Sequence, residues 1–151
     1  MGTTDPAVLT VNAGSSSLQL HLVQNGRVLR AEQSEKSPDP AGVERTLSDF
    51  LDAAPRCEVV AAGHRLVHGG DAVRQPTVVD DDVLAAVRER ADLAPLHVPP
   101  ALALVEACRR RLPEADGAVS RPDAAVPVLV VRSREELQLA RDTLGALGDL
   151  R

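Results

Sequence analysis

The sequence predicts an α/β fold with a mixed sheet and flanking helices, and three observations lead to this prediction. Residues 7–12 and 18–23 have the apolar patterns of β-strands, and the Asn25-Gly26 dipeptide is typical of a hairpin turn into a third strand at 27–30. Residues 59–63 form a continuous apolar run of the kind found in buried strands. Around these strands, apolar residues recur at helical spacing, so helices and strands are expected to share one core.

Three helices are predicted between residues 41 and 112 from apolar stripes and terminal residues. Three aspartates at 80–82 suit the start of the second helix, because carboxylates accept hydrogen bonds from its free backbone N–H groups. Pro99-Pro100 suits the first turn of the third helix. The apolar faces are Val43, Leu47, Phe50, Leu51 and Ala54 in the first helix, Val83, Leu84 and Val87 in the second, and Val98, Leu102, Val105, Cys108 and Leu112 in the third.

The chain divides into three segments. Residues 7–112 are expected to form a lobe, and residues 113–125 break the pattern of strands and helices as a linker would. Residues 126–151 begin with a strand at 126–131 and continue into a last helix, which a capping sequence introduces. The apolar face of that helix is Leu137, Ala140, Leu144 and Leu147.

Composition and charge argue against several classes of function. The 151 residues are 44% hydrophobic, with one Phe, no Tyr and no Trp, and the formal net charge is −5. Binding to single-stranded nucleic acid relies on aromatic platforms and a basic surface, so no nucleic-acid partner is expected. Cys57 and Cys108 stand far apart and outside any paired-cysteine motif, which predicts two buried reduced thiols rather than a disulfide or a zinc site.

No targeting or membrane-spanning segment is predicted. Residues 1–6 contain no basic segment followed by an apolar run, and no apolar stretch approaches the roughly 20 residues that span a bilayer. The sequence therefore predicts a cytoplasmic protein without a membrane partner.

The turn after the first predicted strand is made of small and hydroxyl residues. It runs from Asn12 to Ser17 and reads NAGSSS. Small residues let the backbone approach a phosphoryl group, glycine permits a tight or left-handed turn, and serine hydroxyls add donors. The same residues dominate ordinary solvated turns, and no Gly-Lys-Ser/Thr of a Walker motif is present, so the turn alone leaves both interpretations open.

A second polar cluster follows the buried strand. His64-Arg65 and His68-Gly69-Gly70 flank an apolar pair. An arginine can grip a phosphate or a carboxylate through two parallel hydrogen bonds, and the glycines would let a ligand come close. The alternative is that Arg65 pairs with a structural carboxylate and that His64 is a satisfied polar group of the core.

Four motifs, in order, resemble those of the acetate kinase family. Residues 11–18 read VNAGSSSL, residues 63–70 read GHRLVHGG, and residues 93–100 read LAPLHVPP. Residues 126–143, VPVLVVRSREELQLARDT, are similar to the C-terminal end of that family. Four motifs in the right order are far more specific than any one of them, and together they extend over nearly the whole chain.

The resemblance implies a fold and a reaction. The fold is one lobe of the actin-like, ribonuclease H-like architecture, with a mixed five-stranded sheet and flanking helices. Acetate kinases transfer the γ-phosphoryl group of ATP to acetate with Mg²⁺ and produce ADP and acetyl phosphate. The resemblance therefore implies a phosphotransferase with a carboxyl group as acceptor, ATP as co-substrate and Mg²⁺ as cofactor, and the family's dimers leave a homodimer or a partner protein open.

The resemblance also implies roles for residues of the two polar clusters and of the last helix. By similarity, Asn12, Ser15 and Ser17 line the phosphoryl and metal side of the substrate site. Arg65 is expected to be catalytic and to bind the substrate carboxylate or the phosphoryl group in transfer. Asn12 and Glu135 are the expected Mg²⁺ ligands, although an acid in the first turn of a helix is also favoured by the helix dipole alone.

The third motif supplies the acyl end of the implied site. Val67 and Leu96 would form the small apolar pocket for the acyl methyl group. His97 would be a catalytic residue near the transferred phosphoryl group, and its alternative role is a cap for the following helix.

The sequence departs from the family pattern in its centre and at two site positions. A short segment stands where the family has its second lobe, which holds the catalytic aspartate, a second active-site arginine, another phosphate-contacting histidine and the adenosine pocket. Gln19 stands where the family usually has Lys, and Val98 where it usually has Asn. In the family the last helix packs back on the first lobe, whereas the strand at 126–131 must here join the first sheet or lie at an exposed edge.

Three functions stay open on the sequence. One is a kinase that is active alone or with a partner supplying the nucleotide lobe. The second is a non-catalytic module that retains the phosphate or acyl-phosphate pocket, and the third is an interaction or dimerisation remnant. Because the missing residues normally position the phosphoryl group, the expectation is a truncated kinase that is not competent alone.

Overall fold

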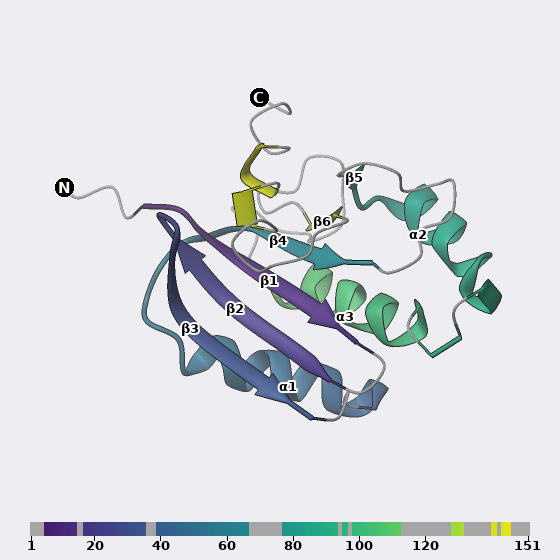
Figure 1. The fold of residues 1–151 in the computed structure, drawn as a ribbon, viewed down its shortest axis with the longest axis horizontal. Helices are drawn as coiled ribbons and strands as arrows, with labels where there is room; N and C mark the ends of the chain where they lie inside the picture. Colours follow the sequence, from purple (N-terminus) through teal and green to yellow (C-terminus); the bar gives the residue numbers. More distant parts are fainter. Residues whose placement is uncertain are drawn as a thin grey trace.

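A mixed sheet of six strands forms the centre of the described part of the chain (Figure 1). The computed structural model describes residues 5–14, 17–35, 39–66, 77–93, 95–96, 98–112, 128–131, 140–141 and 143–145. The order of strands across the sheet is β3-β2-β1-β4-β6-β5. The helices and the sheet together give the predicted α/β class.

The chain opens with the predicted antiparallel meander. Strands β1 (Ala7–Ala13), β2 (Leu18–Gln24) and β3 (Arg27–Ser34) pair in succession, and β3 extends four residues beyond the predicted 27–30. The turn between β2 and β3 places Asn25 at φ 51° and Gly26 at φ 72°. Two successive positive φ values give the tight turn whose twist matches that of the flanking strands.

The second half of the sheet is built by parallel pairing. Strand β4 (Val59–Arg65) lies parallel to β1, and β6 (Val128–Val131) lies parallel to β4. Of the strand predicted at 126–131, residues 128–131 therefore join the first sheet. Strand β5 (Thr77–Val78) pairs antiparallel with β6 at the edge, and this two-residue strand raises the number of strands to six, where five were expected.

The predicted helices form at the predicted places. Helix α1 (Pro40–Asp52) begins after Asp39, whose Oδ1 accepts from Gly42 N at 2.6 Å, and α2 (Asp81–Arg88) begins after Asp80, whose Oδ1 accepts from Val83 N at 2.8 Å. A short 3₁₀ turn (Ala91–Leu93) leads toward α3 (Val98–Arg111). The predicted apolar faces contact the core, with Leu51, Ala54, Val83 and Leu102 only partly buried.

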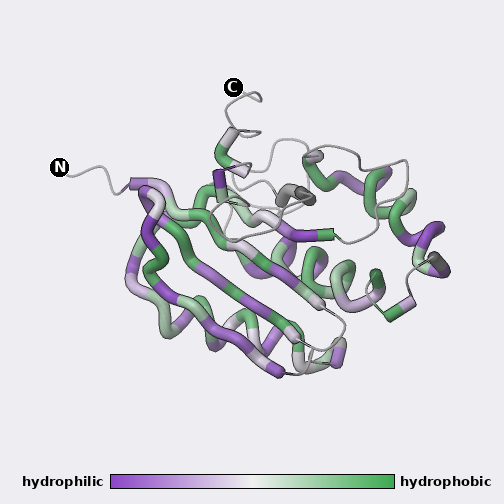
Figure 2. The backbone as a smooth tube through the Cα atoms, in the orientation of Figure 1, coloured by the Kyte–Doolittle hydropathy of each residue, from purple (hydrophilic) through white to green (hydrophobic). Residues whose placement is uncertain are grey.

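The main core lies between one face of the sheet and the helices. Alternate residues of β1 and β2 point into it, which gives the alternating colours of these strands in Figure 2. Phe50, the only aromatic residue of the chain, is fully buried there, and the Arg30 guanidinium lies 5.1 Å from its ring centroid. The remainder of the core is aliphatic, as the composition predicts.

A smaller cluster covers part of the opposite face. Val8 of β1 and Val23 of β2 pack there against Ala140, which belongs to the described helical residues near the C-terminus. Ala140 thus packs on the sheet, whereas Leu144 is 40% exposed. Leu137, Leu147 and the proposed linker at 113–125 lie outside the described residues.

Three consecutive arginines at the end of α3 tie it to both neighbouring helices. Because successive helical residues point about 100° apart, each guanidinium reaches a different carboxylate. The pairs are Arg109 with Asp81 of α2 at 2.9 Å, and Arg110 with Glu44 at 2.5 Å and Arg111 with Asp52 at 2.9 Å, both on α1.

The cysteines partly follow the prediction. Both thiols are free; Cys108 is fully buried, and burial raises the pKa of its thiol to about 12. Cys57 is only partly buried, so the expectation that both thiols are buried is wrong for Cys57, which follows α1 in a connecting segment. None of the helices in the described part of the chain is long and apolar enough to cross a membrane.

The hairpin glycine allows a test of the fold with a matched control. A Cβ at Gly26 would meet no heavy atom within 4 Å, so Gly26→Ala is expected to cost about 1 kcal/mol purely through its positive φ. The helical Gly145 also has open space around it, and Gly145→Ala is expected to stabilise the fold by about 0.5–1 kcal/mol. Urea unfolding followed by circular dichroism measures the change in the free energy of unfolding for both variants. Changes of the same sign would contradict the positive φ at Gly26 or the helical conformation at Gly145.

Candidate functional site

Two of the predicted site residues meet at the carboxyl end of the parallel strand pair. The register of β1 and β4 sets Asn12 beside Arg65. Arg65 Nη1 donates a hydrogen bond to Asn12 Oδ1 at 3.2 Å. Both side chains are partly buried, so the pair is accessible from solvent but held on the sheet. Asn12 and Arg65, 53 positions apart in sequence, therefore lie together as one candidate site.

A third polar side chain extends this pair onto the next strand. The antiparallel register of β1 and β2 sets Gln19 beside Asn12, and Asn12 Nδ2 donates to Gln19 Oε1 at 3.3 Å. Gln19, Asn12 and Arg65 thus form a chain of two hydrogen bonds across three neighbouring strands. We call these three residues the amide relay.

The amide relay lies on the face of the sheet away from the helices. The neighbours of Asn12 in β1, Val11 and Ala13, point into the main core, so Asn12 points the other way. Figure 1 shows α1 and α3 behind the sheet, with the face that carries the relay toward the viewer. The small cluster around Ala140 covers part of that face, at the opposite ends of β1 and β2.

His64 and Arg65 are adjacent in sequence, and their side chains point to opposite faces of the sheet. His64 pairs in register with Val11, points toward the helices and is 2% exposed. Burial lowers the pKa of its imidazole from 6.5 to about 3, so the side chain is neutral at ordinary pH. Within the described residues, His64 Nε2 makes no hydrogen bond. His64 is a core residue, as the alternative interpretation held, but its Nε2 is not satisfied there.

The turn next to the relay is closed by its own backbone. Gly14 N donates to Ser17 O at 2.7 Å, so this N–H group serves the turn rather than a ligand. A Cβ on Gly14 would lie 3.3 Å from Ser17 Oγ and 3.4 Å from Ser17 O. A side chain at position 14 would therefore crowd Ser17. Among the described glycines Gly26 has a positive φ, so Gly14 takes part in a tight turn without the left-handed conformation.

The other predicted site residues are only partly visible. Ser17 is described and half-buried in the turn beside Asn12. Leu96 is 71% exposed, and its proposed partner in the acyl pocket, Val67, lies outside the described residues. Ser15, His97 and Glu135 also lie outside them, so their roles stay predictions.

The described residues do not assemble a magnesium site. In this part of the chain no three His, Cys, Asp or Glu side chains come together. Asn12, one of the two expected ligands, has a single side-chain oxygen, and that oxygen accepts a hydrogen bond from the Arg65 cation. Mg²⁺ prefers several oxygen ligands, and the other expected ligand, Glu135, lies outside the described residues, so the metal site stays a prediction and no step below passes through it.

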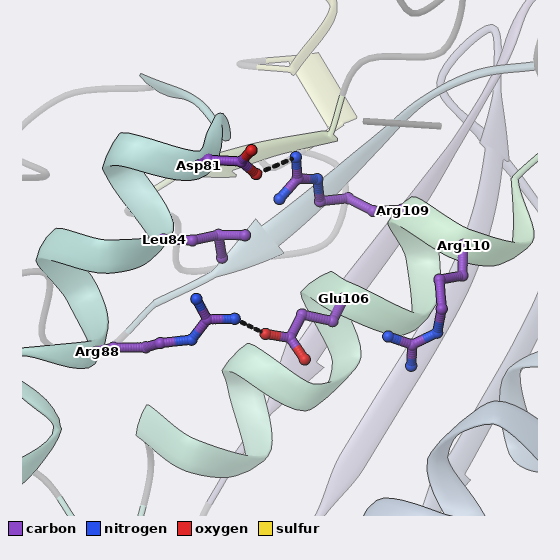
Figure 3. Close-up of a pocket in the computed structure, with 6 residues that line it drawn as sticks. All are labelled: Asp81, Leu84, Arg88, Glu106, Arg109 and Arg110. Carbon is purple, nitrogen blue, oxygen red and sulfur yellow. Dashed lines mark hydrogen bonds and ion pairs between the residues drawn. The ribbon is translucent and has the colours of Figure 1, made fainter. Parts of the chain in front are cut away.

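A separate hollow of about 370 Å³ lies between α2 and α3 (Figure 3). Its charged groups already pair across the helices: Arg88 with Glu106, and Arg109 with Asp81. The Arg109 side chain is 8% exposed and Asp81 is 87% exposed, so the guanidinium packs as a structural element beneath a solvated carboxylate. The lining residues are Asp81, Leu84, Arg88, Glu106, Arg109 and Arg110.

Sequence reasoning named Asn12 and Arg65 as site residues but did not expect Gln19 to contact Asn12. The sequence marked Gln19 only as a departure from a familiar pattern. The signal was nonetheless present, because the tight connection between the first two strands sets Gln19 opposite Asn12, and the alternation of strands then puts both on one face.

The sequence is similar to known proteins over most of its length. The sequence profile of the acetokinase family matches residues 29–126. An acetate kinase from Clavibacter michiganensis subsp. michiganensis is 35% identical over 137 aligned residues, which cover 72% of this chain and 35% of that protein.

Solved structures show the same likeness in three dimensions. The crystal structure of Porphyromonas gingivalis acetate kinase matches with a TM-score of 0.59 and 27% identity, over 83% of this chain and 37% of that one. The acetate kinase of Entamoeba histolytica matches with a TM-score of 0.64 and 21% identity, over 83% of this chain and 35% of that one. The chain therefore has the expected actin-like α/β fold, and it spans little more than a third of these relatives' length.

Proposed function

Because the chain belongs to the acetokinase family, we propose that it takes part in phosphoryl transfer to a small carboxylate and binds that substrate beside Arg65. The observation that carries this proposal is the hydrogen bond from Arg65 Nη1 to Asn12 Oδ1 at the shared carboxyl end of β1 and β4. In open α/β sheets, ligands bind at the carboxyl ends of strands. The pair is therefore where the fold would present an anion-binding group.

The chemistry of the guanidinium suits both the substrate and the product. Arginine carries five N–H donors in a fixed fork, and Asn12 uses one of them. The other donors allow a bidentate contact to a planar carboxylate or to two oxygens of a phosphoryl group. During transfer to a carboxylate, the guanidinium would lower the energy of negative charge that spreads over the phosphoryl oxygens.

The proposed reaction converts a carboxylate and ATP into an acyl phosphate and ADP. One carboxylate oxygen forms a bond to the γ-phosphorus while the bond from that phosphorus to the β–γ bridging oxygen breaks, and ADP leaves with the electron pair. Arg65 holds the acceptor and Asn12 holds Arg65. The nucleotide side would come from a partner protein, because a short segment stands in this chain where the family has its second lobe.

A binding measurement with a charge-matched control tests the proposal. Acetate, phosphate and acetyl phosphate are titrated calorimetrically into the wild-type chain, Arg65→Ala and Arg27→Ala. Arg27 is exposed on β3, and its loss changes the net charge equally. Arg65→Ala is expected to weaken binding at least about tenfold, because charged hydrogen bonds are lost, whereas Arg27→Ala leaves it unchanged.

The second part of the experiment separates an enzyme from a binding module. Formation of acyl phosphate is measured with ATP, acetate and Mg²⁺ in excess. Binding with Arg65-dependent turnover supports the phosphotransferase. Binding without turnover supports the alternative of a non-catalytic module for acyl phosphates. If no ligand distinguishes the wild type from Arg65→Ala, both forms of the proposal fail.

A further inference from the structure

The amide relay is directional, and the chemistry of its end group sets the direction. A guanidinium only donates hydrogen bonds, so the side chain beside it must offer oxygen. Asn12 does so with Oδ1, and its Nδ2 consequently points to the opposite side, toward β2. The group on β2 must then be an acceptor, which Gln19 supplies with Oε1 at 3.3 Å.

This requirement distinguishes Gln19 from the lysine expected at that position by resemblance. A lysine ammonium has three donors and no acceptor. Beside Asn12 it would compete with Arg65 for the single oxygen Oδ1, and Asn12 Nδ2 would lose its acceptor. A glutamine can accept the hydrogen bond from Asn12 Nδ2 while Asn12 Oδ1 accepts from Arg65, and it adds no charge to the three-residue relay.

We infer that Gln19 is a positioning residue that locks the Asn12 amide in the orientation needed to hold Arg65. The relay fixes the guanidinium at the end of β4 through a side chain two strands away. This inference rests on the proposed function in one respect: the guanidinium so held is the group that binds the carboxylate. The orientation of the relay itself is independent of any ligand.

The experiment compares four variants of position 19 and its neighbour on the next strand. Gln19→Glu keeps a hydrogen-bond acceptor for Asn12. Gln19→Met keeps the side-chain length but removes the acceptor, and Gln19→Lys replaces the acceptor with a donor. Gln33→Met is the matched control, because the register sets Gln33 opposite Gln19 but one strand further from Asn12, and it is exposed.

The first readout is the side-chain ¹⁵N NMR spectrum of the ligand-free protein. In the wild type, restricted Asn12 amide and Arg65 guanidinium signals are expected. Gln19→Met and Gln19→Lys should shift both signals toward freely rotating groups, whereas Gln19→Glu and Gln33→Met should retain them. Wild-type signals for Arg65 in Gln19→Met would overturn the inference, and rescue by glutamate distinguishes positioning from general loss of structure.

The second readout is calorimetric affinity for acetate. Loss of one neutral hydrogen bond in Gln19→Met is expected to weaken binding about fivefold, with no change in Gln33→Met. A wild type that binds no acetate would refute the proposed function. The NMR comparison would still show whether Gln19 orients Asn12 and Arg65. Conversely, Arg65-dependent binding that Gln19→Met leaves unchanged would refute the positioning role and leave the proposed function standing.

Discussion

The folded chain is expected to lose stability steeply on acidification because of His64. Burial lowers the pKa of this imidazole from 6.5 to about 3. Between these values the unfolded chain binds a proton that the folded chain does not, so the free energy of unfolding falls as the pH falls. The contribution of His64 to the free energy of unfolding is fully present above about pH 6.5. Below that pH it falls by about 1.4 kcal/mol per pH unit, and the fall amounts to several kcal/mol by the pKa of the folded state.

The burial of His64 gives the physical reason for this sensitivity. The ring is 2% exposed, stands beside Val11 in the sheet and has no partner for Nε2 among the described residues. A charged imidazole there would lose its hydration without gaining an acceptor. Acid is therefore expected to favour the unfolded chain, in which the imidazole can be protonated in water.

Urea unfolding between pH 7 and pH 4.5 measures the effect. Circular dichroism is the appropriate probe, since the chain has no Trp or Tyr. His64→Gln is expected to have a flatter pH dependence than the wild type, whatever its stability at pH 7. His21→Gln, which changes a partly exposed histidine on β2 and leaves His64 in place, should keep the wild-type decline. Parallel curves for the wild type and His64→Gln would contradict the role of His64.

Asn12→Asp is expected to weaken acetate or acetyl phosphate binding about 100-fold without unfolding the protein. The change is isosteric, and the new carboxylate would stand 3.2 Å from Arg65 Nη1, where it forms an ion pair. Two unit charges 4 Å apart near a protein surface interact by about 4 kcal/mol, so an anionic ligand would meet a neutralised guanidinium and a nearby negative charge. Gln19 can turn its amide to donate to the new carboxylate.

A charge placed further along the same row is the control for Asn12→Asp. Gln33→Glu adds the same charge two strands from Asn12, about 10 Å away at the ordinary strand spacing. That distance is close to the Debye length in physiological salt, so its effect on affinity should be a few-fold at most. Equal affinity losses in the two variants, or no loss in Asn12→Asp, would show that the anion does not bind at the Arg65–Asn12 pair.

Local patterns predicted most of the described fold. The Asn25-Gly26 turn, the caps at Asp39 and Asp80, and the apolar faces of α1, α2 and α3 depend on neighbours within a few positions in sequence. Such short-range signals can be interpreted without knowing the fold. The two-residue β5 has too few residues to show a pattern, and its pairing with β6 depends on where that strand lies.

For the site, the sequence by itself determined which chemical groups are available: an amide at Asn12, a guanidinium at Arg65 and an unusual glutamine at position 19. Only the tertiary structure decided how these groups are used. Parallel pairing of β1 with β4 brings Asn12 to Arg65, and antiparallel pairing of β1 with β2 brings Gln19 to the other side of Asn12. The same pairing turns His64 into the core although it adjoins Arg65 in sequence. The physical reason is that side-chain alternation is local, whereas register and the choice of buried face arise from contacts between strands distant in sequence.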